Sequence, residues 1–313
     1  MSNLPPEISN LRSRLTETAS ISLVDKIQFC LVSSSFTSEI ILTSYVCADR
    51  VKNAQASPDR EPPILLLHGF DSSLLEFRRL LPKLAHSHQT WAMDLFGFGL
   101  TERLADTQVS PEAIKDHLYY FWKTMIAQPI VLVGASMGGA AAIDFTLTYP
   151  EVVKKLILIG SAGMRKGSLA GKFLVPPLDR MATDFLRSPK VRREVSLKAY
   201  VDSSLVTTDA EVCASLHLAM PRWSESLISF TKSGGYGSFA DQLRFLKQET
   251  LILWGDRDRI LGTKDAAKFQ STIPHNKLVW IDRSGHVPHL ERPEITAQEI
   301  LQFIASDSMN YPH

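Results

Sequence analysis

Short runs of consecutive apolar residues recur along the chain and alternate with segments whose apolar residues stand three or four positions apart. Continuous runs of this kind are typical of strands buried on both faces of a parallel sheet, and the wider spacing is typical of helices with one apolar face. The runs lie at 64–67, 90–93, 130–134, 156–159, 251–254 and 277–282. Their alternation with helical patterns predicts an α/β fold with a mostly parallel, doubly wound sheet.

Three patterns concern the first third of the chain. Residues 39–48 predict a strand, and residues 19–32 carry apolar side chains at helical spacing, which predicts a helix packed on the core. A peripheral membrane anchor is the alternative interpretation of residues 19–32. Ser73 and Glu76 fit a capping box, which predicts a helix that begins there and continues through Leu84.

The alternation of strands and helices breaks after residue 163. Residues 164–249 contain helical patterns interrupted by proline and glycine, and no clear parallel strand, before the alternation resumes. We therefore expect an N-terminal extension with a helix at 1–38, an α/β core formed by 39–163 and 250–313, and a helical insertion at 164–249 that acts as a cap over the core.

The pentad Gly134-Ala135-Ser136-Met137-Gly138 lies between a predicted strand and a segment of small residues that predicts a helix. Gly-x-Ser-x-Gly in this position is the pattern of a nucleophile elbow, a turn so tight that the residues flanking the serine must be small. The turn exposes the hydroxyl, and the N–H groups at the start of the helix favour negative charge nearby. Ser136 is therefore a candidate nucleophile.

A serine nucleophile needs a base to take its proton and an acid to orient that base. Both residue types follow predicted strands further along the chain, where Asp256 and Asp258 come after one strand and His286 and His289 after the next. In α/β-hydrolases the three groups occur in the order serine, acid, histidine.

Five motifs occur in order: His-Gly-Phe at 68–70, Asp-Leu-Phe-Gly-Phe-Gly at 94–99, Gly-Ala-Ser-Met-Gly-Gly at 134–139, Gly-Asp-Arg-Asp at 255–258 and Gly-His at 285–286. This set resembles the α/β-hydrolase superfamily, in the helical-cap branch that includes haloperoxidase-like esterases and C–C bond hydrolases. The resemblance extends over residues 39–305. The residues at 68–73 and 230–236 are also similar to hydrolases of cyanobacteria and plastids.

The resemblance implies an α/β-hydrolase fold and a role for each chemical group. Ser136 would be the nucleophile, and His286, which directly follows a glycine, would be the general base. The family spacing Gly-x-x-Asp favours Asp258 as the acid, which leaves Asp256 to order the turn. His289 is the rival base, and we expect it to be a hydrogen-bonded loop or core residue.

The resemblance also implies an oxyanion hole formed by the backbone N–H groups of Phe70 and Met137. His68 would bond within its own loop, and Asp94 would order the turn after its strand. The chain departs from the family pattern at 260–262, where Ile-Leu-Gly stands in place of the proline that often follows the acid. This difference leaves the geometry of that loop open.

Composition narrows the function classes only slightly. Hydrophobic residues make up 44% of the chain and charged residues 21%, and the net charge of +1 gives no indication of nucleic-acid binding. The three cysteines fit no metal or redox motif, and the mechanism needs neither a metal nor an organic cofactor. Because we find no secretory signal pattern and no apolar run of about 20 residues, we expect a cytoplasmic protein.

The first half of the predicted cap is basic, with nine cationic and three acidic residues between 165 and 198. One interpretation is a surface that meets anionic lipid or an acidic substrate, and the other is an ordinary solvated helical face. Several apolar residues could form either an acyl channel or the cap's own core: Met164, Phe173, Leu174, Met181 and Phe185.

We expect a serine hydrolase that cleaves the ester of a fairly apolar small molecule through an acyl-enzyme. The alternatives are cleavage of a C–C bond in a β-diketone-like substrate by the same residues, acyl transfer, and a receptor-like binding protein with little turnover. Phe-Asp-Ser-Ser at 70–73 disfavours the C–C hydrolases, which usually carry a Gly-rich loop there. Serine at the elbow disfavours epoxide hydrolases and dehalogenases, which need a carboxylate at that position.

Overall fold

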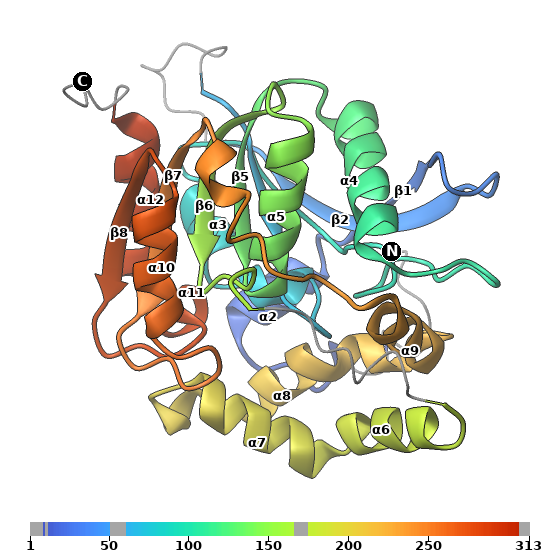
Figure 1. The fold of residues 1–313 in the computed structure, drawn as a ribbon. Coiled ribbons are helices and arrows are strands. Elements are labelled where there is room, and N and C mark those ends of the chain that lie inside the picture. The colour runs from blue at the N-terminus through green and yellow to red at the C-terminus, as the bar shows by residue number, and fades with distance from the viewer. Residues whose placement is uncertain (1–8, 10–11, 51–60, 166–174, 307–313) are drawn as a thin grey trace.

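The computed structural model describes residues 9, 12–50, 61–165 and 175–306, and it contains one eight-stranded sheet (Figure 1). The strand order is β1-β2-β4-β3-β5-β6-β7-β8, in which β1, β2 and β4 pair antiparallel and all other neighbours pair parallel. The strands are β1 (Gln28–Val32), β2 (Ile41–Ala48), β3 (Ile64–Leu67), β4 (Thr90–Met93), β5 (Ile130–Ala135), β6 (Val153–Ile159), β7 (Glu249–Gly255) and β8 (Asn276–Ile281). The predicted mostly parallel α/β sheet is confirmed.

Helices cover both faces of this sheet. They are α2 (Thr18–Val24), α3 (Leu81–Leu84), α4 (Pro111–Met125), α5 (Met137–Thr148), α10 (Lys264–Thr272), α11 (Pro288–Glu291) and α12 (Pro293–Ala305). Apolar side chains of α4, α5 and α10 share one core cluster, and those of α2, α3 and α12 share the other. The sheet is therefore the middle layer of three.

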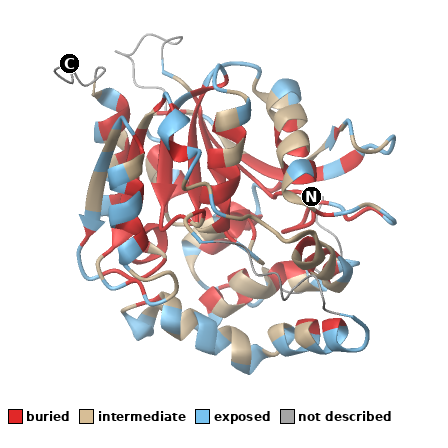
Figure 2. Ribbon diagram, viewed as in Figure 1, coloured by how far each residue is buried: buried red, intermediate tan, exposed pale blue. Residues whose placement is uncertain are grey.

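Strand β3 shows why the apolar runs are continuous. Leu65 and Leu67 belong to one core cluster, and Ile64 and Leu66 belong to the other. All four side chains are fully buried, as is most of the central sheet (Figure 2). Because successive side chains of a strand point to opposite faces, a strand covered by helices on both sides must be apolar at every position.

Between β6 and β7 the chain leaves the sheet and forms four helices, which lie together beyond the carboxyl ends of the parallel strands (Figure 1). These insertion helices are α6 (Leu178–Arg187), α7 (Pro189–Ala199), α8 (Thr208–Ser215) and α9 (Trp223–Ser233). Short 3₁₀ helices also occur: η1 (Leu74–Phe77), η3 (Ser203–Leu205), η4 (Leu216–Ala219) and η5 (Leu243–Phe245). Of the chain that the structure describes, no helix is both long enough and apolar enough to cross a membrane.

The prediction of one helix over residues 19–32 is wrong in its second half. Helix α2 ends at Val24, and Gln28–Val32 forms the edge strand β1, which pairs antiparallel with β2. The helical spacing was misleading because pairing with β2 decides the conformation of this segment, in which only Val32 is buried. Leu23 and Val24 are buried in the core, so α2 turns these two side chains towards the protein, whereas Leu31 of β1 is exposed.

The capping box at Ser73 and Glu76 is also wrong. The Ser73 hydroxyl accepts a hydrogen bond from the Leu75 N–H, but the Glu76 carboxylate accepts one from the Gly69 N–H at 2.9 Å. The segment forms η1 and then α3 in place of one continuous helix. A tertiary partner for Glu76 replaced the local bond on which the capping box depends.

Candidate active site

The candidate nucleophile lies at the turn between β5 and α5. Ser136 has φ 52° and ψ −117°, a conformation that costs a residue other than glycine about 1–3 kcal/mol. The turn is held by the Ser136 N–H, which donates to the Ile159 carbonyl at 2.9 Å, and by the Ser136 carbonyl, which accepts from the Ala162 N–H at 2.9 Å. The surrounding backbone therefore holds the serine in this strained conformation.

The glycines of the pentad are required by close backbone approach. A Cβ atom on Gly138 would lie 2.1 Å from the Leu67 carbonyl oxygen, and one on Gly134 would lie 2.2 Å from the Gly138 carbonyl oxygen. Neither neighbour is a flexible side chain that could move away. The structure therefore shows the steric constraint that requires small residues in a nucleophile elbow.

Ser136, His286 and Asp258 meet at the carboxyl edge of the sheet. The Ser136 Oγ lies 3.0 Å from His286 Nε2, and His286 Nδ1 lies 2.9 Å from Asp258 Oδ2. The other Asp258 oxygen accepts from the N–H groups of Ile260 at 2.8 Å and Leu261 at 3.0 Å. A proline at either position would lack that donor, so the departure from the family pattern supplies hydrogen bonds that order the loop.

The environment of Asp258 favours its ionised form. Burial opposes the charge, but the hydrogen bonds from His286 and from the loop N–H groups outweigh burial and lower the pKa of Asp258. An ionised carboxylate at Nδ1 fixes the imidazole tautomer in which Nε2 is free to accept the Ser136 proton.

The two rival residues lie elsewhere. Asp256 accepts a hydrogen bond from the Ser284 N–H at 3.1 Å, and so orders the loop before the histidine. His289 Nε2 lies 3.0 Å from the Glu76 carboxylate. The structure therefore brings Asp258 and His286 to Ser136, and it brings neither Asp256 nor His289 there.

His68 and Asp94 hold loops around the site. His68 Nδ1 donates to the Gly69 carbonyl at 2.8 Å, and its Nε2 accepts from the Leu95 N–H at 3.1 Å. Asp94 is fully buried and accepts from the Leu74 N–H, the Leu100 N–H and the Ser44 hydroxyl. The polar atoms of both side chains therefore bind the protein around the site, in their own loop or in neighbouring segments.

The loop after β3 brings Phe70 close to the elbow. A Cβ on Gly69, the preceding residue, would lie 3.3 Å from the Ser136 Cβ. Within the described residues, neither the Phe70 N–H nor the Met137 N–H donates to an internal acceptor. Two backbone donors beside the serine are thus available to a ligand.

Glu76 is a positioning residue that we did not predict from the sequence. Its two oxygens bind the Gly69 N–H and His289, at 2.9 and 3.0 Å. Burial opposes its charge, but these partners outweigh burial and lower the pKa of Glu76 to about 2. The carboxylate thereby fixes the loop that carries Phe70.

Asp71 joins that same loop to the insertion helices. Its carboxylate accepts from Arg192 at 2.7 Å, from His217 at 3.0 Å and from the Trp223 indole at 2.8 Å. Burial opposes its ionisation, but these partners outweigh burial and lower its pKa to about 2. The only sequence signal was its place directly after Phe70, and its partners lie more than 120 residues away.

Glu291 makes a second connection, at the histidine loop. It accepts from the Gly285 N–H at 2.6 Å and from the Val201 N–H at 2.8 Å. The His286 N–H donates directly to the Ala199 carbonyl, at the end of α7, at 2.7 Å. The insertion helices are therefore bonded to both loops that flank Ser136.

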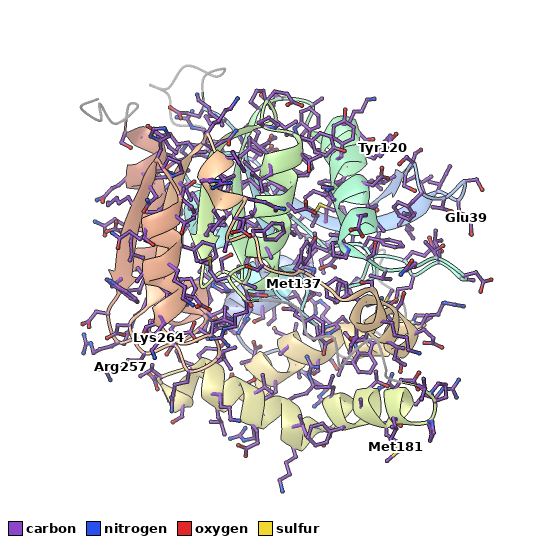
Figure 3. All side chains as sticks on the ribbon, in the orientation of Figure 1. Glu39, Tyr120, Met137, Met181, Arg257 and Lys264 are labelled. Carbon is purple, nitrogen blue, oxygen red and sulfur yellow. The ribbon has the colours of Figure 1, made fainter. Side chains whose placement is uncertain are left out.

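A cavity of about 360 Å³ opens beside Ser136 and His286, between the sheet and the insertion helices. Met137, which is labelled in Figure 3, lies between the sheet and the insertion helices and shows where this site is. Apolar residues of the insertion helices that line it include Leu186, Val191, Val195, Ala199, Ala210 and Ala214.

Two arginines in the cavity wall have buried nitrogens without a hydrogen-bond partner among the described residues: Nε and Nη2 of Arg78, and Nε of Arg192. Arg78 is only 2% exposed. Its nearest carboxylate is that of Glu17, 3.9 Å away, which makes two shorter bonds to Arg79. Arg78 thus places a positive charge in the cavity wall.

The described residues give little support to a metal site or to a reactive cysteine. No group of three or more His, Cys, Asp or Glu residues there could hold a metal ion. Cys30, Cys47 and Cys213 are unpaired, and burial raises the pKa of Cys30 to about 11 and of Cys47 to about 12. These two thiols are therefore protonated at neutral pH.

The model of the alpha/beta hydrolase fold family matches residues 62–293. The chain belongs to the α/β-hydrolase family. Alpha/beta hydrolase domain-containing protein VTE7 of Arabidopsis thaliana is 30% identical over 302 residues, which cover 96% of this chain and 89% of that protein. This result confirms the resemblance seen in the five motifs.

Two further α/β-hydrolases are similar. The 2-hydroxy-6-oxo-2,4-heptadienoate hydrolase of Pseudomonas putida is 25% identical over 254 residues, which cover 78% of this chain and 90% of that enzyme. The structure of a thermophilic esterase from Thermogutta terrifontis superposes with a TM-score of 0.73 at 23% identity, and covers 89% of this chain and 100% of that one. The esterase shows the shared fold.

Proposed function

We propose that this α/β-hydrolase is a serine hydrolase that cleaves the carboxylic ester of a fairly apolar small molecule through an acyl-enzyme. The observation that carries the proposal is the 3.0 Å contact between Ser136 Oγ and His286 Nε2, with the ionised Asp258 on the opposite side of the imidazole. A serine, a histidine and a carboxylate bonded in this order form the arrangement that activates a hydroxyl for attack on a carbonyl carbon.

In the proposed reaction, His286 takes the Ser136 proton as the hydroxyl oxygen bonds to the ester carbonyl carbon. The N–H groups of Phe70 and Met137 donate to the oxyanion that forms. The imidazolium, stabilised by Asp258, then gives its proton to the departing alcohol. Water attacks the acyl-enzyme with His286 again as base, which releases the acid and restores the serine.

The cavity supports a fairly apolar substrate. Its wall on the side of the insertion helices is built mainly from Leu, Val and Ala side chains, and its volume of about 360 Å³ is within the range of small-molecule sites. The two acids in the wall, Asp71 and Glu76, are both engaged with internal partners. They therefore leave little free negative charge in the wall, which would otherwise repel an anion and disfavour an apolar acyl chain.

Arg78 favours a second candidate function. Its positive charge in the cavity wall suits a substrate with a carboxylate at one end, as the name heptadienoate implies for the substrate of the Pseudomonas putida relative. The second candidate is hydrolysis of a C–C bond in a β-diketone-like substrate that carries such a carboxylate. Ser136 Oγ would bond to a carbonyl carbon, the adjacent C–C bond would break, and the departing carbon would receive the proton that His286 took from the serine. Water would then release the acid from Ser136.

The first test compares the wild type with Ser136→Ala on p-nitrophenyl esters from acetyl to palmitoyl, with Ser271→Ala as the control. We expect ester cleavage that is lost in S136A and kept in S271A, because Ser271 is on the exposed side of α10. A folded wild type that cleaves none of these esters would refute the ester-hydrolase proposal.

A second test separates the two candidates. The variant Arg78→Met removes the positively charged guanidinium group and keeps most of the side-chain volume. If the substrate carries a carboxylate, KM for a carboxylate-bearing substrate should rise about 10- to 100-fold while that for an uncharged ester stays unchanged. An equal effect on both substrates would contradict a role of Arg78 in binding the anion.

A further inference from the structure

Helix α6 exposes three large apolar residues, while the residues that it buries are both polar. Leu178, Met181 and Phe185 stand three and four positions apart, so they share one face, and they are 57%, 61% and 64% exposed. Asp179 and Thr183 on another face are only 4% exposed. A helix of a soluble protein normally has the opposite arrangement.

Specific bonds hold the helix in this orientation. Asp179 forms an ion pair with Lys232 of α9 at 2.8 Å, and the Thr183 hydroxyl lies 2.6 Å from the Ser224 hydroxyl, also on α9. Rotation that buried Phe185 would remove both contacts. The apolar face is thus turned outward, and Met181 points away from the body of the protein at its lower edge (Figure 3).

Helix α7 continues this surface. It has no buried residue, and Val195 is 51% exposed (Figure 2). Across α6 and α7 the exposed charges are five cations against two acids: Arg180, Arg187, Lys190, Arg193 and Lys198 against Asp184 and Glu194. Two of these cations have partners, since Arg187 lies over the Trp223 ring and Arg193 pairs with Glu211.

We propose that the outer face of α6 and α7 docks this protein on an anionic lipid surface. Exposed apolar side chains among cations are the combination that binds a bilayer interface, because the apolar groups enter the acyl boundary while the cations remain at the anionic headgroups. The two helices form the edge of the molecule farthest from the sheet, where a flat surface can reach them (Figure 1).

The same charges disfavour a second copy of the chain as the occupant. A symmetric dimer through this face would place the same patch on both subunits and so bring the cations together. A phospholipid headgroup supplies the opposite charge.

The docking surface is also next to the cavity. Leu186, Val191 and Val195 of these two helices line the cavity beside Ser136. An apolar molecule that leaves the bilayer would therefore meet the helices that form the cavity wall. The docking itself does not depend on the proposed ester hydrolysis.

The test is co-sedimentation of the full chain with phosphatidylcholine vesicles, with and without phosphatidylglycerol. We compare the wild type with the double variant M181S/F185S, and use Phe245→Ser as the matched control. Phe245 is 61% exposed but lies on η5, outside the docking surface. All three side chains are exposed, so the variants should keep the wild-type circular dichroism and Tm.

We expect the wild type to bind vesicles that contain phosphatidylglycerol, and to bind more weakly as salt is added. The double variant should bind at least tenfold more weakly, since each buried apolar side chain contributes about tenfold or more. F245S should bind as the wild type does.

Three results would overturn the proposal. The first is a wild type that binds neither kind of vesicle. The second is a double variant that binds as well as the wild type, or a control that loses binding to the same extent. The third is a wild-type dimer in solution that becomes monomeric in M181S/F185S, which would assign the face to a second copy. None of these measurements uses turnover, so each is independent of the proposed activity.

Discussion

The variant Asp71→Asn tests whether the loop beside Ser136 is fixed through the insertion helices. Asp71 has a positive φ of 47°, a conformation that asparagine also tolerates, so the backbone should keep its shape. The amide has nearly the size of a neutral carboxyl group, but lacks the negative charge that Arg192, His217 and Trp223 now share. The substitution therefore removes the negative charge and leaves the backbone conformation and the side-chain size nearly unchanged.

The magnitude follows from the pKa of Asp71. Its decrease from the ordinary value of 3.8 to about 2 corresponds to about 2 kcal/mol, at about 1.4 kcal/mol per pKa unit. The side chain is only 9% exposed, so solvent screens this contribution little. We therefore expect Asp71→Asn to lower the free energy of unfolding at pH 7 by about 2 kcal/mol, and to lower Tm by about 3 °C.

The pH dependence of this loss has a definite sign. Because the pKa of Asp71 is lower in the folded state, its charge stabilises the protein fully above pH 4 or so and less as pH falls towards about 2. The difference between wild type and variant should therefore be constant near neutral pH and fall to about half by pH 3.

The assay is urea unfolding at pH 7 and at pH 3, with Asp282→Asn as the control. Asp282 is largely exposed, and the same chemical change there should alter stability by less than about 0.5 kcal/mol. Equal stability of Asp71→Asn and wild type at pH 7 would refute the argument that the charge of Asp71 fastens the loop to the helices. So would a deficit of the same size at pH 3 and pH 7.

Three further predictions concern the site. Asp258→Asn should lower kcat/KM about 10⁴-fold, whereas Asp256→Asn, which lacks contact with the histidine, should lower it by less than about tenfold; steady-state kinetics on the best p-nitrophenyl ester measure both. Gly138→Ala should fail to accumulate as folded protein, or unfold with a loss above about 3 kcal/mol, because its Cβ would lie 2.1 Å from the Leu67 carbonyl oxygen; a wild-type Tm would contradict this. Glu76→Gln should cost about 3 kcal/mol at pH 7 in urea unfolding, since its pKa of about 2 lies well below the ordinary 4.5, and no loss would show that its charge is not used.

The strands and the elbow could be predicted from the sequence because their causes are local. Ile64–Leu67 is apolar at every position, which a strand covered on both faces requires. The glycines on each side of Ser136 are imposed by carbonyl oxygens of the same turn and of the neighbouring strand. Although Leu67 is distant in the sequence, the residues that must be apolar or small are consecutive, so they leave a pattern that can be recognised without the fold.

The edge strand and the capping box could not be predicted, because hydrogen bonds to residues outside each segment decided its structure. Leu31 continues the helical spacing of apolar residues that begins in α2, but pairing with β2 makes Gln28–Val32 a strand. Glu76 is at the right distance from Ser73 for a capping box, but Gly69 and His289 bind its carboxylate. The local preference of a segment for helix or strand contributes less free energy than a buried hydrogen bond to another part of the chain.

The sequence by itself determined the fold class, the strained turn at Ser136 and the order of the serine, the acid and the histidine. Only the tertiary structure decided that Asp258 and His286 lie against that serine, that Asp71 binds three residues of the insertion, and that α6 turns Phe185 outward. The physical reason is that hydrophobic periodicity reports how much of a face is buried, while the partner of a buried charge is set by where distant segments meet.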